Sequence, residues 1–260
     1  MLLQAKRKMK LVNHLGEQAI NNQGIKMTII EYNKKDDIIV QFEDGSIKHT
    51  AYQCFKKGEV KSKFYRGYYG VGYTGDTTIM NGKNIKKSFQ TWSGIIERCY
   101  SEKSFKTRPT YENCTVCDEW LCYANFEKWY DEHYYELDNE RMNLDKDILY
   151  KHNKEYNPKY CIFVPSKINS LFTKSDKARG ELPIGVKEDN GKYRARVNQR
   201  ILGKMYSSHV FNTIEEAFND YKTVKENYIK EVADYYKNKY PQFPKKLYDA
   251  MYNYKVEITD

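Results

Sequence analysis

Residues 144–169 concentrate the side chains of this chain that could perform chemistry. Within one short stretch they include two carboxylates, an imidazole and three amides, at Asp145, Asp147, His152, Asn153, Asn157 and Asn169. Carboxylate and amide oxygens suit a hard divalent cation such as Mg²⁺, and an imidazole can accept a proton near neutral pH. The pattern fits a hairpin followed by a helix, which could hold a divalent metal ion against a phosphodiester.

Two predicted helices precede this segment and would support it. From residue 88 to about residue 100, apolar side chains recur at spacings of three and four, which predicts an amphipathic helix. A second helix is predicted around Trp120 and Trp129. It ends in the acidic run 131–140, which would repel phosphate and is expected on a face away from any nucleic acid.

Short extended runs open the chain. Residues 27–32 and 37–42 are rich in Ile and Val, residues 43–45 are the turn signal Glu-Asp-Gly, and a third extended run is expected over residues 46–55. These runs predict a small antiparallel β-barrel or meander. It carries no chemical motif, so we expect an accessory or recruitment role. The glycine-rich segment 65–84 that follows is expected to be a linker.

Three strands and a helix are predicted toward the C-terminus. The strands are expected over residues 184–189, 192–199 and 204–211. The Asn-Gly pair at 190–191 is a strong signal for a two-residue hairpin turn. A Thr-x-x-Glu capping box at residues 213–216 predicts the start of the helix.

The middle strand of this set separates two faces. Because successive side chains of a strand point to opposite faces, Tyr193, Ala195 and Val197 would pack on the helix. The solvent face would carry Lys192, Arg194, Arg196 and Asn198. Such a row suits a β-ribbon in a DNA major groove, where Arg reads guanine and Asn reads adenine. A merely solvated face is the alternative, which the repulsion between neighbouring like charges disfavours.

The composition favours a polyanionic partner. The 260 residues carry 44 Lys and Arg against 35 Asp and Glu, a formal net charge of +9, together with 25 Tyr and 11 Phe. Clustered cations release counterions from nucleic acid, and so many aromatic residues exclude wholesale disorder. We find no apolar run of membrane-spanning length and no secretory signal, and read the six cysteines as reduced thiols. A cytoplasmic protein with no membrane partner is expected.

The patterns together predict an α+β protein of three domains. Residues 1–75 would form the small β accessory domain. Residues 76–178 would form a middle domain around the 144–169 segment. Residues 179–260 would form a three-stranded antiparallel sheet packed on a helix, with further C-terminal helices.

The last of these regions resembles a known DNA-binding domain. Residues 182–235 are similar to the three-strand-plus-helix domain of plant APETALA and ethylene-response factors, which also occurs in phage and bacterial homing endonucleases. The Gly-Lys-Tyr-Arg-Ala-Arg core at 191–196 and Glu-Glu-Ala at 215–217 carry the resemblance. It implies that the sheet, not the helix, enters the groove. The implied contacts are Lys192, Arg194 and Arg196, with Arg200 and Lys204 as phosphate partners.

The middle region resembles the HNH endonucleases of phages, in the lineage where such a nuclease precedes this same sheet domain. The matching pieces lie at residues 92–100, at residues 116–121, and from Leu-Asp-Lys-Asp at 144–147 to Ile-Asn at 168–169. Together they span residues 88–175. The order of nuclease before sheet domain strengthens both resemblances.

The HNH resemblance implies a ββα-metal fold that binds one Mg²⁺, with a histidine that activates the attacking water. By position, Asp145 would be the hairpin metal ligand and Asn169 the helical ligand. Either Asn153 or Asn157 would be the middle asparagine that braces the loop. Lys146 falls at the position of the general base.

Lys146 leaves the catalytic role open. A lysine with an ordinary pKa of about 10 is protonated at neutral pH and cannot accept a proton. There are three alternatives. Burial could lower the pKa of Lys146 so that it acts as the base. Either His152 or Asp147 could act as the base instead, or the nuclease could be inactive and only bind DNA. In the last case Lys146 would simply contact phosphate.

The cysteines suggest a different kind of site. Cys114 and Cys117 form a Cys-x-x-Cys pair, with Cys122 nearby and Cys99 and Cys161 further off. Together they could form a structural Zn²⁺ site. Buried thiols in a core are favoured instead, because free cysteine behaves as a small hydrophobic residue.

The favoured hypothesis is a sequence-specific double-stranded DNA-binding protein of the HNH endonuclease type, a homing endonuclease if it hydrolyses phosphodiesters with Mg²⁺. The alternative is a catalytically inactive HNH-derived binder that acts as a phage regulator or inhibits a host defence system. In either case the N-terminal domain could bind a host or phage protein, in the cytoplasm of a bacterial host cell. The basic strand face disfavours a zinc-stabilised interaction protein with no nucleic-acid role.

Overall fold

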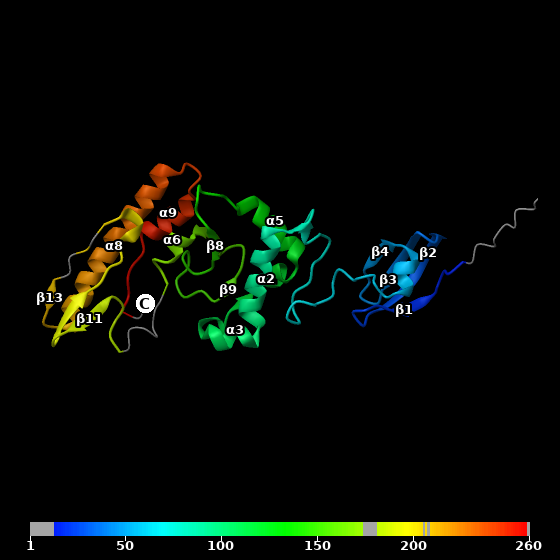
Figure 1. Ribbon diagram of the computed structural model, residues 1–260, viewed down its shortest axis with the longest axis horizontal. Helices are drawn as coiled ribbons and strands as arrows, with labels where there is room; N and C mark the ends of the chain where they lie inside the picture. The colour runs from blue at the N-terminus through cyan, green and yellow to red at the C-terminus, as the bar shows by residue number, and fades with distance from the viewer. Residues whose placement is uncertain (1–12, 174–180, 205, 207–208, 259–260) are drawn as a thin grey trace, which may run out of the picture. The chain divides into compact units, whose positions relative to one another are not determined.

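The computed structural model describes residues 13–173, 181–204, 206 and 209–258 (Figure 1). It is a mixed α+β protein with several small antiparallel sheets, and the described residues form no closed barrel. The α+β prediction is confirmed, and the N-terminal strands form a meander. None of the helices in these ranges has the length and apolar character needed to cross a bilayer.

Internal contacts divide the chain into two compact units. One comprises residues 1–112 and 118–128, and the other comprises residues 113–117 and 129–260. The second unit contains both the 144–169 segment and the C-terminal sheet, which the sequence assigns to separate domains. The three domains stay a prediction, because such contacts do not define which segments fold independently.

The first unit opens with a four-stranded antiparallel meander in which neighbours in sequence are neighbours in the sheet. Its core is made by alternate residues of two strands, Met27, Ile29, Ile38 and Val40, each at most 1% exposed. This period of two is the one expected for a strand with one buried face. The strands are β1 (Gln18–Ile20), β2 (Lys26–Lys34), β3 (Asp37–Phe42) and β4 (Ile47–Thr50).

The third extended run of the meander is shorter than predicted. Instead of continuing to residue 55, the chain leaves the sheet at Thr50 and turns into the helix α1 (Tyr52–Lys56). The turn places Phe55, which is fully buried, in the apolar core of the meander. Burial of a phenylalanine side chain stabilises by roughly 1.5 to 3 kcal/mol, which favours the turn over continued strand pairing.

Helices form much of the remainder of the first unit. The helix predicted over residues 88–100 is confirmed as α2 (Lys87–Tyr100), and Trp92 in it is fully buried. The indole Nε1 of Trp92 donates a 2.7 Å hydrogen bond to the carbonyl oxygen of Trp120. The glycine-rich segment, expected to be a linker, packs here too, since the Tyr68 ring lies edge-on to Trp92 with 5.0 Å between centroids. Flanking elements are β5 (Met80–Asn81), β6 (Asn84–Ile85), α3 (Glu102–Thr107), the 3₁₀ helix η1 (Pro109–Tyr111), α4 (Asp118–Leu121) and α5 (Tyr123–His133).

The second unit holds a hairpin followed by a helix, in the order that the 144–169 segment predicts. β8 (Met142–Asp145) pairs antiparallel with β10 (Ile162–Pro165), and α6 (Ser166–Asn169) begins directly after β10. The long loop between the two strands carries β9 (Glu155–Tyr156), which pairs in parallel with β7 (Thr115–Val116). The loop is therefore held against residues 115–116 by strand pairing.

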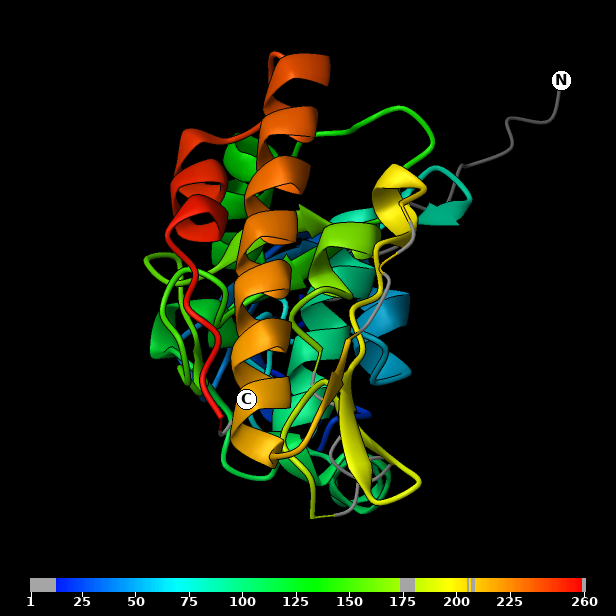
Figure 2. The same cartoon turned by 90° about the vertical axis from the view of Figure 1, so that its left-hand side faces the viewer.

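Three antiparallel strands in the order β11-β12-β13 form the C-terminal sheet. They are β11 (Val186–Asp189), β12 (Lys192–Ala195) and β13 (Val210–Phe211). The helix α8 (Ile214–Lys239) shares one apolar core with this sheet and a second with α6, and α9 (Lys245–Tyr252) lies beside it (Figure 2). One long helix therefore links the hairpin segment to the sheet.

All three strands of this sheet are shorter than predicted, and the first, predicted over residues 184–189, begins at Val186. The middle strand, predicted over residues 192–199, ends at Ala195, because Gly185 with φ of +76° turns the partner strand away at that level. The third strand, predicted over residues 204–211, is a strand at Val210–Phe211. Part of that predicted strand, residues 205, 207 and 208, lies outside the described residues.

The predicted start of the C-terminal helix is confirmed. The backbone N–H of Glu216 donates to Thr213 Oγ1 at 3.2 Å, and the backbone N–H of Thr213 donates to the Glu216 carboxylate at 3.2 Å. This capping box satisfies two backbone donors at the helix start. It fixes the end of α8 that follows the sheet.

Candidate functional site

Asp145 ends β8 and is held by the loop that follows it. Its Oδ1 accepts hydrogen bonds from the backbone N–H groups of Asp147 (2.9 Å) and Ile148 (2.7 Å). The other carboxylate oxygen, Oδ2, accepts no hydrogen bond from the described residues. A carboxylate with one oxygen oriented by the backbone and one left over suits a metal ligand.

The surroundings of Asp145 raise its pKa to about 6. Burial is the largest cause, since removal from water disfavours the charged form, and the Asp147 carboxylate adds to it. The two backbone N–H groups and Lys146 act in the opposite direction without cancelling the effect. Asp145 is therefore mostly charged at neutral pH but close to its titration range, as functional carboxylates often are.

Lys146 is buried and engaged at its charged end. Its ammonium group lies 2.9 Å from Asp147 Oδ2 and donates a 3.0 Å hydrogen bond to the carbonyl oxygen of Asn153. Asn153 returns the contact, because its Nδ2 donates to the carbonyl oxygen of Lys146 at 2.7 Å. This reciprocal pair of bonds, the Lys146–Asn153 clamp, closes the loop after β8.

The pKa of Lys146 lies above its ordinary value. Burial acts to lower the pKa, but the charge of Asp147 and its hydrogen bond more than offset that effect. The lysine therefore stays protonated at neutral pH. Activation of Lys146 as a base through burial does not fit this geometry.

Asn153 spans the loop, whereas Asn157 bonds locally. Nδ2 of Asn153 also donates to the carbonyl oxygen of Glu155 at 2.7 Å, so one amide ties two parts of the loop together. Oδ1 of Asn157 accepts from the N–H of Lys159 at 2.8 Å, as in a turn, and its Nδ2 donates to the Glu155 carboxylate at 3.0 Å. Of the two asparagines, Asn153 has the geometry of a loop brace.

His152 is solvent-accessible and lies near a carboxylate. It has φ of +66°, its side chain is 56% exposed, and Nε2 lies 3.5 Å from a carboxylate oxygen of Glu257. An exposed imidazole beside a carboxylate can accept a proton. Sequence reasoning missed Glu257, because no local pattern links a residue so far along the chain to the loop.

Asn169 is the last residue of α6 and is half-buried. Its side-chain amide makes no hydrogen bond with the described residues, so its oxygen is not engaged. Amide oxygens are accepted ligands of hard divalent cations. Asp145 and Asn169 each therefore have one side-chain oxygen that no described residue engages.

Four of the six cysteines, Cys99, Cys114, Cys122 and Cys161, are buried, whereas Cys54 and Cys117 are partly exposed. Burial raises the pKa of the Cys114 and Cys161 thiols. Over the described ranges, no group of three or more His, Cys, Asp or Glu side chains could hold a metal ion. Mg²⁺ at Asp145 and Asn169 stays a prediction, as does the less favoured Zn²⁺ site.

The two-faced pattern of the predicted middle strand persists past the end of β12. Tyr193, Ala195 and Val197 belong to the core shared with α8. Lys192 and Arg196 are exposed, and their charged groups have no hydrogen-bond or ion-pair partner among the described residues. These two cations are available to a ligand on the solvent side.

Arg194 is restrained by a neighbouring strand. Its Nε donates a 2.8 Å hydrogen bond to Asp189 Oδ2 on β11. The ion pair relieves part of the repulsion within the basic row, and it would have to open for Arg194 to contact a base. Asp189 was not foreseen, although the hairpin turn implies that it faces the start of β12.

The remaining predicted DNA contacts, Asn198, Arg200 and Lys204, do not lie on the exposed face of β12. Lys204 forms a 2.7 Å ion pair with Glu231 of α8. Oδ1 of Asn198 accepts the backbone N–H of Arg200 at 3.1 Å, where the 3₁₀ helix η2 (Arg200–Leu202) begins. Asn198 and Arg200 line a cavity beside α8 instead of extending the row.

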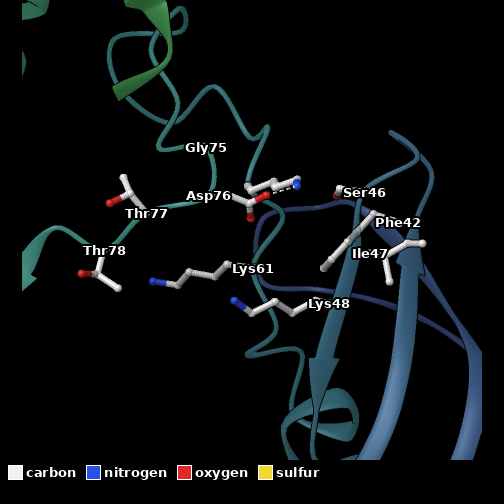
Figure 3. A pocket seen from close by; sticks show the side chains of 10 residues that line it. Phe42, Ser46, Ile47, Lys48, Lys61, Gly75, Asp76, Thr77 and Thr78 are labelled. Atoms are coloured by element: carbon white, nitrogen blue, oxygen red, sulfur yellow. Dashed lines mark hydrogen bonds and ion pairs between the residues drawn. The ribbon is translucent and has the colours of Figure 1, made fainter. Parts of the chain in front are cut away.

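A basic hollow of about 270 Å³ lies in the first unit, between the meander and the glycine-rich segment (Figure 3). The Lys48 and Lys61 side chains extend in the same direction, toward Thr78, and Lys63 is ion-paired with Asp76. Lys48 and Lys61 have no carboxylate partner among the residues that the structure describes. The hollow is therefore electropositive, which could not be foreseen because the two lysines come from separate segments.

Neither a protein-family model, nor a curated protein, nor a solved structure matches the chain. The resemblances to HNH endonucleases and to the APETALA-type domain therefore rest on their motif residues alone and stay predictions.

The raised pKa of Asp145 predicts that Asp145→Asn stabilises the fold at neutral pH. Asparagine keeps the Oδ1 acceptor and removes a buried charge, so the free energy of unfolding should rise by about 1 to 3 kcal/mol. Because the folded-state pKa is raised, the wild type loses stability as pH rises from about 4 to about 6. The gain should therefore be full at pH 7.5 and shrink toward pH 4, as measured by urea denaturation with a chelator present.

Asp147→Asn is the matched control. It removes the same charge but also the partner of the buried Lys146 ammonium, so this variant should be less stable than the wild type. An Asp145→Asn variant that is destabilised at pH 7.5 would contradict the burial of an unfavourable carboxylate.

Proposed function

We propose that the chain is a sequence-specific double-stranded DNA-binding protein of the HNH endonuclease type. The observation that carries the proposal is the basic row at the C-terminal sheet, in which Lys192 and Arg196 are exposed and unpaired among the described residues and Arg194 lies between them. Arginines on an exposed strand have the reach and donor geometry to read guanine in the major groove. The net charge of +9 favours the same kind of partner.

The hairpin segment supports the nuclease part of the proposal. β8, β10 and α6 succeed one another as in a ββα-metal motif, and the resemblance gives Asp145 and Asn169 the ligand positions. Both residues fit an oxygen-preferring ion, because each has an oxygen not engaged by the described residues. When bound, Mg²⁺ would stabilise negative charge on the leaving oxygen. The backbone N–H groups of the loop would keep Asp145 oriented.

His152 is the residue we propose as general base. Lys146 is held as a cation and cannot accept a proton from water, whereas His152 is exposed. The Glu257 carboxylate, 3.5 Å from Nε2, would stabilise the imidazolium that forms. Lys146 would then hold the loop and contribute positive charge near the phosphate.

A second candidate is a catalytically inactive HNH-derived binder, acting as a phage regulator or as an inhibitor of a host defence system. The fixed charge of Lys146 at the position of the general base favours it. In this role the N-terminal meander could contact a host or phage protein, and the basic hollow at Lys48 and Lys61 would favour an acidic surface on that protein.

The DNA-binding claim predicts unequal effects along the basic row. With a duplex selected from a random library by the wild type, Arg196→Ala should cost about 1 to 3 kcal/mol and relax specificity. Arg194→Ala should cost less, because binding must first open the Asp189 ion pair, and Asp189→Asn should tighten binding. Fluorescence anisotropy against the selected and a scrambled duplex measures these changes. Lys246→Ala, an exposed cation on α9, is the control and should have little effect; equal affinities for all variants would remove the sheet from the interface.

The catalytic claim predicts Mg²⁺-dependent nicking of plasmid that carries the selected site. Asp145→Asn and His152→Ala should each slow nicking by about a hundredfold or more while duplex binding is retained. Asp145→Asn is preferred to alanine because its expected gain in stability excludes unfolding as the cause. Binding without nicking by the wild type would favour the inactive binder, and full activity of His152→Ala would exclude His152 as the base.

A further inference from the structure

A cavity of about 480 Å³ lies in the second unit, between the end of α6, the helix η2 and the part of α8 from Lys225 to Lys239. Four cationic side chains and one carboxylate line it: Lys167, Arg200, Lys225, Lys239 and Glu140. The carboxylate is already engaged, because Glu140 accepts from Lys167 at 2.7 Å and from the Tyr236 hydroxyl at 3.1 Å. Three cations therefore face the cavity without a carboxylate partner among the described residues.

Lys225 is the central observation. It lines the cavity from α8, is half-buried, and has no hydrogen-bond or ion-pair partner in the part of the chain that the structure describes. Burial lowers its pKa to about 8. A buried ammonium group without a partner is unfavourable, and an apolar side chain at this helix position would pack without that cost. The position is better explained by a negatively charged ligand that completes the site.

The rim of the cavity adds recognition of a second kind. Tyr235 lines it and is 42% exposed, and Lys239 lies over the Tyr235 ring at 5.5 Å from the centroid. Exposed aromatic rings beside cations are typical of sites that take a nucleotide base together with its phosphate.

We propose that this cavity is a nucleotide-phosphate site, in which Lys225 and Arg200 bind the phosphate and Tyr235 contacts the base. The site does not include Lys192, Arg194 or Arg196 of the basic row, nor the proposed metal ligands. The phosphate could belong to a free mononucleotide or to the DNA backbone, which the same measurement distinguishes.

The test is calorimetric titration of the full-length chain with dAMP, with deoxyadenosine and with a 20-base-pair duplex. Wild type should bind dAMP and not deoxyadenosine, and Lys225→Met should weaken dAMP or duplex binding by about tenfold or more. Lys222→Met, on the same helix but outside the cavity lining, should stay within about twofold of wild type. Arg196→Ala should leave dAMP binding unchanged, so failure of this site and failure of the sheet interface are separable.

The pH dependence of the affinity distinguishes a charged role of Lys225 from a packing role, because packing would not change with the protonation of Lys225. Affinity should fall between pH 7 and pH 9 for the wild type as Lys225 loses its proton, and Lys225→Arg should bind without this fall. The other titratable groups facing the cavity are of types whose ordinary pKa values lie outside this range, namely Glu140, Lys167, Arg200, Tyr235, Tyr236 and Lys239.

Loss of dAMP binding alone in Lys225→Met identifies a free nucleotide as the ligand, and loss of duplex binding alone identifies the DNA backbone. Unchanged binding of both ligands by Lys225→Met would overturn the proposal, as would absence of binding by the wild type. Equal losses in Lys225→Met and Lys222→Met would also overturn it, because the effect would then reflect net charge.

Discussion

The candidate site depends on how one buried lysine is kept charged. Lys146 is 8% exposed, and an ammonium group in such a place is tolerated only with close partners. Asp147 supplies the counter-charge, and Asn153 exchanges side-chain and backbone hydrogen bonds with Lys146. These contacts determine the path of the loop after β8, so they also determine where the backbone N–H groups that orient Asp145 lie. Loss of either Asp147 or Asn153 would therefore alter the orientation of the proposed metal ligand Asp145.

The same constraint directs the functional interpretation. A lysine held by a carboxylate is a stable cation, so the position that the HNH resemblance assigns to a base supplies positive charge instead. In the proposed function, DNA binding would gain from that charge, whereas hydrolysis would need another base, for which we propose His152. The basic row of β12 and the cavity at Lys225 lie in the same compact unit as this loop.

Much of the fold could be predicted because the spacing of apolar residues along the sequence indicates which side chains are buried. The spacing of Phe89, Trp92 and Ile96 predicts α2, and the alternation at Tyr193 and Ala195 predicts which face of β12 is buried. The end of β4 could not be predicted, because Phe55 gains its burial from a turn that the extended pattern does not encode. Contacts between segments far apart in the sequence could not be predicted either. No local sequence pattern predicts the contact between His152 and Glu257. In the sequence, Lys225 cannot be distinguished from the other polar positions of an amphipathic helix.

The most direct test of the central claim, duplex DNA binding by the second unit, is photo-cross-linking to the selected duplex carrying 5-iododeoxyuridine, with the linked peptides mapped by mass spectrometry. We expect cross-links in peptides that contain residues 192–200 and in peptides that contain the loop of residues 145–155. Cross-links confined to the N-terminal meander, or none above the level of a scrambled duplex, would contradict it.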